Sequence, residues 1–194
     1  SYFSGKFADG SEDKEMAGVM IEEVDRLSRV ISELLEFARP AKLNRKPANV
    51  NELLKHSVRL VQQEATAKNV RIQLNLTPDT VEADVDPDRL IQCFLNLYLN
   101  ALQAMKNGGQ LMIASFTKGS GNVAIDIRDN GSGISADDLS KIFDPYFTTK
   151  PKGTGLGLTI VQKIIEAHHG QVKVRSAIGQ GTVFSITLPL NSAR

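Results

Sequence analysis

Glycine residues gather in the C-terminal half of this chain. Eight of its 15 glycines lie between residues 131 and 181, and seven of those form three clusters. The clusters are Asp129-x-Gly131-x-Gly133, Gly153-x-Gly155-x-Gly157 and Gly179-x-Gly181. Glycine lets main-chain N–H groups crowd an anion and permits positive φ. One such cluster is more often an ordinary turn than a binding loop, but three in this order predict a pocket for a phosphorylated ligand.

A helix expected from Asp86-Pro87 to about Lys106 carries a second signal. Beside its apolar stripe runs a polar one, which consists of Gln92, Asn96, Asn100 and Gln103. Asparagine is a poor helix former, and two carboxamides surrounded by leucines are costly if buried without partners. They therefore either bond to neighbouring backbone or face a polar ligand. Beside the glycine clusters, the ligand interpretation is favoured.

The elements that must position these groups follow from periodicity and punctuation. Asn49 and Glu52 resemble a capping box that opens a helix reaching about Lys68, and a third helix is expected over 154–168. Alternating strands are predicted over 70–76, 110–118, 122–129, 171–176 and 182–188. These elements indicate an α+β sandwich in which three helices cover one face of a mixed, largely antiparallel sheet.

The N-terminal part has a different pattern. Apolar residues spaced 4, 3, 4, 3 and 4 apart form a coiled-coil-like seam within 12–38: Met20, Val24, Leu27, Ile31, Leu34 and Ala38. Pro40 disfavours continuing this helix. One interpretation is a single amphipathic helix lying on its own domain; the regular seam favours a helical hairpin and a dimer. We therefore expect a hairpin remnant at 1–40, a linker at 41–48 and a globular domain at 49–190.

Composition excludes several classes of protein. The net charge is +1 and the pI about 7.8, so no overall basic excess predicts a nucleic-acid partner. The single cysteine, Cys93, excludes an internal disulfide and a cysteine-built zinc site. No apolar run approaches the ~18 residues needed to cross a bilayer. The chain opens at Ser1 without methionine, in an apolar-aromatic stretch, and is expected to be a fragment.

The motifs resemble, in order and spacing, the N, G1, F, G2 and G3 boxes of bacterial sensor histidine kinases. The matching segments are Asn96-x-x-x-Asn100, Asp129-x-Gly131-x-Gly133, Phe143-Asp144-Pro145-Tyr146-Phe147, Gly153-Thr154-Gly155-Leu156-Gly157-Leu158 and Gly179-x-Gly181-Thr182. The resemblance covers about residues 47–190 and is greatest to the nitrogen-regulation branch, with the zinc-responsive envelope sensors of enteric bacteria as a further match. The helix at 12–38 resembles the second helix of the family's dimerisation and phosphotransfer domain.

This resemblance implies the Bergerat ATP-binding fold, with ATP and Mg²⁺ as cofactors. Asp129 would accept a hydrogen bond from the exocyclic amine of adenine, while Gly131 and Gly133 let the base lie against the main chain. Asn100 would offer its amide oxygen to Mg²⁺, and Asn96 would support the cation or its water.

The resemblance also implies a lid from about Ile134 to Thr154, hinged at Gly133 and Gly153. In that reading Lys150 reaches the terminal phosphates, and Gly155 and Gly157 open the third helix so that its amides stabilise phosphate oxygens. The remaining expected nucleotide contacts are Ile134, Phe143, Phe147, Thr154, Leu156, Leu158 and Thr182.

The implied reaction is transfer of the γ-phosphoryl group to a histidine, with Asn96, Asn100 and Lys150 as the catalytic set. Relatives of this fold that hydrolyse ATP use a glutamate at the position of Asn96 to activate water. An asparagine cannot take a proton from water at neutral pH. The phosphoacceptor histidine is expected upstream of Ser1. An aspartate on a response regulator would receive the group next. The family implies a homodimer and the cytoplasmic portion of an inner-membrane sensor. A serine kinase or ATPase of the same fold, and a non-enzymatic scaffold, are the alternatives.

The three histidines lack the surroundings of a phosphoacceptor. We expect His56 to be solvated, His168 to be in the core and His169 to stand where the family usually has a C-cap glycine. A metal site at the pair His168-His169 is disfavoured. Tyr146 and Cys93 are expected to be packing residues.

Overall fold

The structure is a computed structural model that describes residues 12–38, 43–78, 81–106, 108–119, 121–151 and 153–190. It divides into two compact units between Arg39 and Pro40. The phosphoacceptor expected before Ser1 and the proline expected to stop the first helix lie outside the described residues.

The first unit contains the helix α1, Glu12–Ala38, which confirms the predicted helix. Its apolar seam is exposed: Met20, Val24, Leu27 and Ile31 are each more than half accessible. Of the described residues, no helix is long and apolar enough to cross a membrane.

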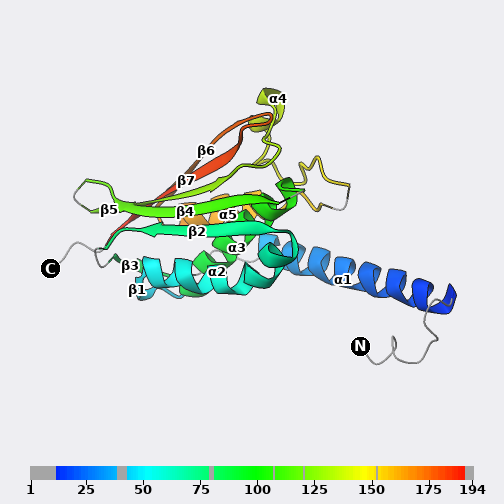
Figure 1. Ribbon diagram of the computed structural model, residues 1–194. Helices are drawn as coiled ribbons and strands as arrows, with labels where there is room; N and C mark the ends of the chain where they lie inside the picture. The colour runs from blue at the N-terminus through cyan, green and yellow to red at the C-terminus, as the bar shows by residue number, and fades with distance from the viewer. Residues whose placement is uncertain are drawn as a thin grey trace. The chain divides into compact units, whose positions relative to one another are not determined.

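The second unit is built on a five-stranded sheet with strand order β2-β4-β5-β7-β6 (Figure 1). The strands are β2 (Val70–Leu76), β4 (Gly109–Thr117), β5 (Asn122–Asp129), β6 (Gln171–Ala177) and β7 (Gly181–Pro189). Only the β2–β4 pair is parallel within this sheet; the other three pairings are antiparallel. The predicted mixed, largely antiparallel sheet is confirmed.

Three main helices cover one face of the sheet: α2 (Val50–Ala67), α3 (Pro87–Ala104) and α5 (Gly157–Ala167). α2 contacts β2, α3 contacts β4, β5 and β7, and α5 contacts β6. The sequence sets two of the starts: the side chain of Asn49 caps α2 and that of Asp86 caps α3, where proline follows at the first helical position.

The core lies between these helices and the sheet. Alternate strand residues face the helices, so Leu111, Ile113, Ile125, Ile127 and Ile186 are almost fully buried. From the helices they meet Leu54, Leu90, Phe94, Leu97 and Tyr98, all at most 1% exposed. Each such aliphatic side chain stabilises the fold by about 1.5–3 kcal/mol relative to exposure.

Some elements differ from the sequence analysis. Residues 46–48, assigned to the linker, begin strand β1 (Lys46–Asn49), which pairs antiparallel with β3 (Glu82–Val85) in a separate two-stranded sheet. A short helix α4 (Ala136–Leu139), capped by Ser135, lies within the expected lid. The third helix begins at Gly157 rather than residue 154, because Gly155 has φ +72° and cannot be helical.

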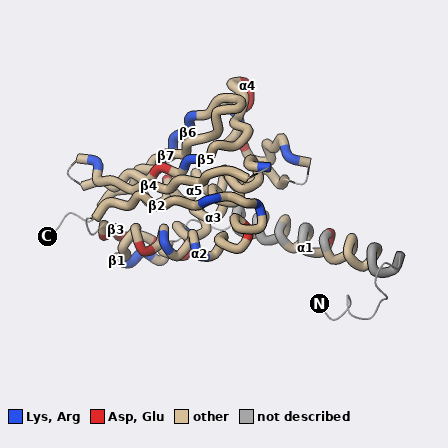
Figure 2. The backbone as a smooth tube through the Cα atoms, viewed as in Figure 1, with Lys and Arg blue, Asp and Glu red and all other residues tan. Residues whose placement is uncertain are grey.

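Charged residues of both signs are interspersed over the domain (Figure 2). On α2, Glu52 and Lys55 form an exposed ion pair at 2.7 Å.

Candidate nucleotide site

A lysine of the expected lid contacts the polar stripe of helix α3. The ammonium of Lys150 donates to Oδ1 of Asn100 at 2.7 Å and to Oε1 of Gln103 at 2.6 Å. Lys150 is exposed as a residue, but its ammonium is partly withdrawn from water by this contact. The resulting loss of hydration lowers the pKa of Lys150. The lysine and the asparagine expected to act together are thus in direct contact.

One turn earlier, α3 contacts the start of α5. The side-chain amide of Asn96 donates to the carbonyl oxygen of Gly157 at 3.3 Å. A Cβ added at Gly157 would meet nothing closer than Cγ of Asn96, at 4.0 Å. The helix therefore begins beside Asn96, and no side chain caps its start. The free N–H groups of such a helix N-terminus can bind an anion.

One turn later, α3 contacts the loop that follows Asp129. The backbone N–H of Ser132 donates to the carbonyl of Ala104 at 3.1 Å. A Cβ added at Gly131 would lie 2.8 Å from Cβ of Ala104, so this position needs glycine for the loop to reach the helix. Asn96, Asn100 and Ala104, on successive turns of α3, thus contact the start of α5, Lys150 and the loop after Asp129.

Asp129 itself is 5% exposed at the end of β5. Its Oδ1 accepts from the backbone N–H of Gly131 at 2.8 Å. Burial raises the pKa of Asp129, while hydrogen bonds from the backbone of Gly131 and Thr182 oppose that rise. The carboxyl group is thus fixed in a dry environment, where a hydrogen bond to a ligand is strong.

Two other expected contacts lie in the same region. Thr182 pairs with Asp129 across β5 and β7 and is buried. The backbone N–H of Ile134 donates to Oγ of Ser176 at 2.9 Å, and that hydroxyl lies 3.0 Å from Oγ1 of Thr182. Ser176 was not predicted from the sequence as a site residue, although a serine at an inward-facing position of an alternating strand could have indicated it.

Residues of the expected lid contact α5 and the second glycine cluster. The carbonyl of Phe143 accepts from Oγ1 of Thr159 on α5 at 3.0 Å, and Phe147 is half-buried. A Cβ added at Gly155 would lie 2.3 Å from the carbonyl carbon of Tyr146, so the second glycine cluster is packed against the lid's own backbone. Leu156 is buried, whereas Thr154 and Leu158 are half-buried and Gly153 is exposed.

The structure corrects one expectation and confirms others. Tyr146 is not a packing residue: it is 62% exposed, and it has φ +67°. Cys93 is fully buried and His168 is 2% exposed, as expected. His56 is exposed, and His169 has φ +58° after α5, the left-handed conformation for which a C-cap glycine is usual.

The donor set fits a magnesium ion. Mg²⁺ prefers oxygen ligands and retains several waters, and the carboxamide oxygens of Asn100 and Gln103 already converge on one cationic group. Within the described part of the chain, no group of three or more His, Cys, Asp or Glu residues is arranged to hold a metal. Gln103 was seen in the polar stripe but was not expected in the site.

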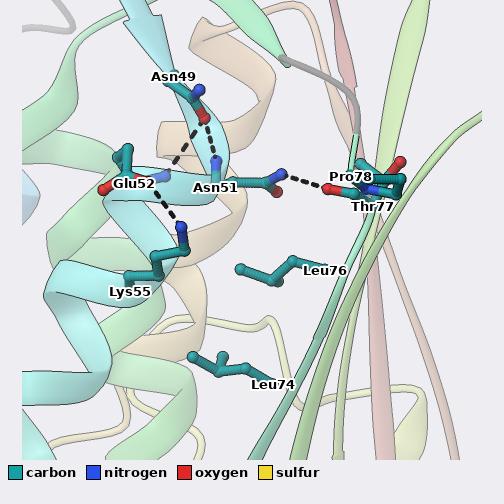
Figure 3. Close-up of a pocket in the computed structure, with 8 residues that line it drawn as sticks. All are labelled: Asn49, Asn51, Glu52, Lys55, Leu74, Leu76, Thr77 and Pro78. Carbon is teal, nitrogen blue, oxygen red and sulfur yellow. Dashed lines mark hydrogen bonds and ion pairs between the residues drawn. The ribbon is translucent and has the colours of Figure 1, made fainter.

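A cavity of about 470 Å³ lies elsewhere, between the start of α2 and the end of β2 (Figure 3). The side-chain amide of Asn51 reaches across it to the carbonyl of Thr77 at 2.9 Å. Thr77 directly follows the last residue of β2. Before the first residue of β2, the carbonyl of Asn69 accepts from the backbone N–H of Gly109, which lies beside Asn130 in the loop after Asp129. The cavity is therefore at the far end of the strand from the residues described above.

Comparison with known proteins gives consistent results. Residues 85–192 match the family of histidine kinase-, DNA gyrase B- and HSP90-like ATPases. The sensor histidine kinase ZraS of Salmonella typhimurium is 45% identical over 189 residues, which are 97% of this chain and 41% of ZraS. The chain thus spans less than half of the curated relatives it matches.

Solved structures agree. The catalytic domain of histidine kinase ThkA has a TM-score of 0.69 at 30% identity, covering 76% of this chain and 96% of that domain. The structure of ThkA in complex with the response regulator TrrA has a TM-score of 0.78 at 27% identity, covering 94% of this chain and 53% of that chain. The structure of full-length ShkA in complex with AMPPNP has a TM-score of 0.82 at 28% identity, covering 96% of this chain and 41% of that chain.

The fold and the motif positions thus define an ATP-binding α/β sandwich, and the chain belongs to the family of histidine kinase-, DNA gyrase B- and HSP90-like ATPases. Within that family, its globular unit is a catalytic domain of the sensor histidine kinase type.

Proposed function

We propose that this domain binds Mg·ATP and transfers the γ-phosphoryl group to a histidine of a dimerisation helix. The group then passes to an aspartate on a response regulator. The observation that carries the proposal is the series of contacts along α3. Successive turns of this helix contact the start of α5, the lid lysine and the Asp129 loop through Asn96, Asn100 and Ala104.

Each of these contacts has a chemical task in the proposal. Asp129 accepts from the adenine amine, Asn100 holds Mg²⁺ by its amide oxygen, and Lys150 neutralises the terminal phosphates. The open N-terminus of α5 at Gly157 provides backbone N–H groups for phosphate oxygens. When bound, Mg²⁺ neutralises phosphate charge, so transfer depends on positioning and electrostatics.

The absence of a carboxylate at Asn96 favours transfer to another group over hydrolysis. Asn96 is held by its bond to Gly157, and a carboxamide is not a base at neutral pH. The alternatives, an ATPase or a serine kinase of the same fold, have no support from the relatives, which are sensor histidine kinases.

The remaining features of the proposal concern the whole protein. The exposed apolar seam of α1 supports a homodimer through a helical hairpin. The ThkA–TrrA complex supports a response-regulator partner. Attachment to the inner membrane through other segments, with this part in the cytoplasm, is proposed from the sensor kinases that the chain resembles.

One experiment separates the proposed activity from its alternatives. The chain is mixed with a separate fragment that carries the family's phosphoacceptor helix, and with ATP labelled on its γ-phosphate. We expect a labelled fragment whose phosphate is lost in acid and retained in base. Acid-stable label would indicate a serine or threonine kinase, and steady release of phosphate without labelled protein would indicate an ATPase.

A further inference from the structure

The lid lysine is held by two amide oxygens of one helix face. Asn100 and Gln103 lie three residues apart on α3, so their side chains project from the same side of the helix. Both oxygens lie within 2.7 Å of Nζ of Lys150. The contact therefore joins the lid, some 50 residues further along the chain, to the helix that carries the polar stripe.

The chemistry of this contact is that of a cation site. An ammonium group and a magnesium ion differ in size and charge, but both take oxygen ligands and both suit uncharged amide oxygens. Because neither partner is a carboxylate, Lys150 is held by charge-assisted hydrogen bonds and not by a buried ion pair. Another cation can therefore replace the ammonium of Lys150 at these oxygens, and the departure of the ammonium leaves no unpaired negative charge in the protein.

We infer that Asn100 and Gln103 together form a cation site that Lys150 and Mg²⁺ occupy in turn, so that entry of magnesium with the nucleotide releases the lid lysine toward the phosphates. This rests on the proposed assignment of Mg²⁺ to Asn100. It adds Gln103 as a residue that positions the cation, and it makes lid release a consequence of metal binding.

Gln103 is suited to a test because it is exposed. Replacing it by leucine removes the oxygen, keeps a similar side-chain size and opens no cavity in the core. Gln62, an exposed glutamine on α2, provides a matched control as Gln62→Leu. Thermal unfolding of both variants checks that the fold is intact.

The first measurement follows the ammonium directly. In protein labelled with ¹⁵N-lysine, at slightly acidic pH and low temperature, the Nζ resonance of Lys150 is assigned as the signal lost in Lys150→Met. We expect it to shift in Gln103→Leu without any ligand, and not in Gln62→Leu. In the wild type, Mg·ADP should shift it, and ADP with EDTA should shift it much less.

The second measurement is calorimetric. A non-hydrolysable ATP analogue is titrated at a series of Mg²⁺ concentrations, and the concentration that gives half of the magnesium effect is compared between variants. Gln103→Leu should raise that concentration about tenfold, the usual lower bound for losing a group that supports a metal ligand. Gln62→Leu should leave it unchanged.

Two results would overturn the inference. One is a Lys150 resonance in ligand-free protein that Gln103→Leu does not move; the other is a magnesium requirement that Gln103→Leu does not change. Failure of the proposed function looks different: the wild type would then bind no adenine nucleotide, while the effect of Gln103→Leu on the ligand-free resonance would persist.

Discussion

The backbone N–H of Asp86 donates a hydrogen bond to Nε2 of the buried His168, at 2.9 Å. Nδ1 of the same ring lies 2.8 Å from the carbonyl oxygen of Ile164, so the ring is neutral, with its proton on Nδ1. Asp86 also caps α3 and accepts from the N–H of Asn44 at 2.8 Å. Nearby, Arg45 donates to the carbonyl of Ala167. The segment that enters the domain is thus fixed to the start of α3 and the end of α5.

This arrangement predicts a loss of stability on mild acidification. Burial is the main cause that lowers the pKa of His168, and the charges of Arg45 and His169 add to it, whereas the Ile164 carbonyl and Asp86 oppose it. The folded pKa therefore lies below the unfolded value of 6.5. The stabilising contribution of the neutral ring is complete above that value and is lost as the pH falls below it, by up to about 1.4 kcal/mol per pH unit.

Chemical unfolding between pH 7.5 and about 5.5 would measure this loss, since carboxylates remain largely ionised there. His168→Gln can keep both hydrogen bonds and does not titrate, so its stability should depend less on pH than that of the wild type. His56→Gln, at an exposed position, should retain the wild-type dependence. Equal slopes for wild type and His168→Gln would contradict the assignment.

Adenine recognition makes a second prediction. Asp129→Asn replaces an acceptor-only carboxylate by an amide of the same shape, and should weaken binding of an ATP analogue about 10- to 100-fold, the value of a charge-assisted hydrogen bond. Asp126→Asn, three residues earlier on β5 but on the opposite face of the sheet, is the matched control. Calorimetry measures both affinities. Retained affinity in Asp129→Asn would refute the adenine contact.

Magnesium provides a third prediction. Asn100→Ala should remove most of the difference between analogue binding in Mg²⁺ and in EDTA, because the proposed amide ligand is gone. The exposed Asn75, on β2, is the control as Asn75→Ala. Both titrations are calorimetric, and an unchanged magnesium effect in Asn100→Ala would displace this residue as the ligand.

Most of the fold could be predicted because its signals are local. The caps Asn49 and Asp86 fix where α2 and α3 begin, and strict alternation identified every strand of the five-stranded sheet. The two-stranded sheet of β1 and β3 was missed because each strand has only four residues, and β1 contains Pro47. Pairing partners 33 residues or more apart give no periodic signal in such short segments.

The site was predicted as a set of motifs but not as a set of contacts. Spacing indicated that Asn96 and Asn100 share a helix face, which the structure confirms. That Gly131 packs on Ala104, and that Lys150 reaches Gln103, depends on how distant segments meet. Tyr146 was expected to pack, whereas it is exposed and has a positive φ at the point where Gly155 lies against its backbone, a long-range contact that the local sequence does not signal.

The two kinds of glycine in the site support a last prediction. Gly157 has room for a Cβ and no positive φ. Gly157→Ala should therefore leave the free energy of unfolding unchanged or increase it by up to about 1 kcal/mol, and the melting temperature should stay the same or rise. If its backbone faces phosphate, the added methyl group should nevertheless weaken binding of an ATP analogue, by about tenfold for a loss of about 1.4 kcal/mol. Gly131→Ala should instead lower the stability of the fold. Its Cβ would lie 2.8 Å from Cβ of Ala104, which costs about 1–3 kcal/mol of stability. Differential scanning fluorimetry and calorimetry on both variants separate the two roles. A Gly157→Ala protein that binds nucleotide as the wild type does would show that the start of α5 does not contact the phosphates.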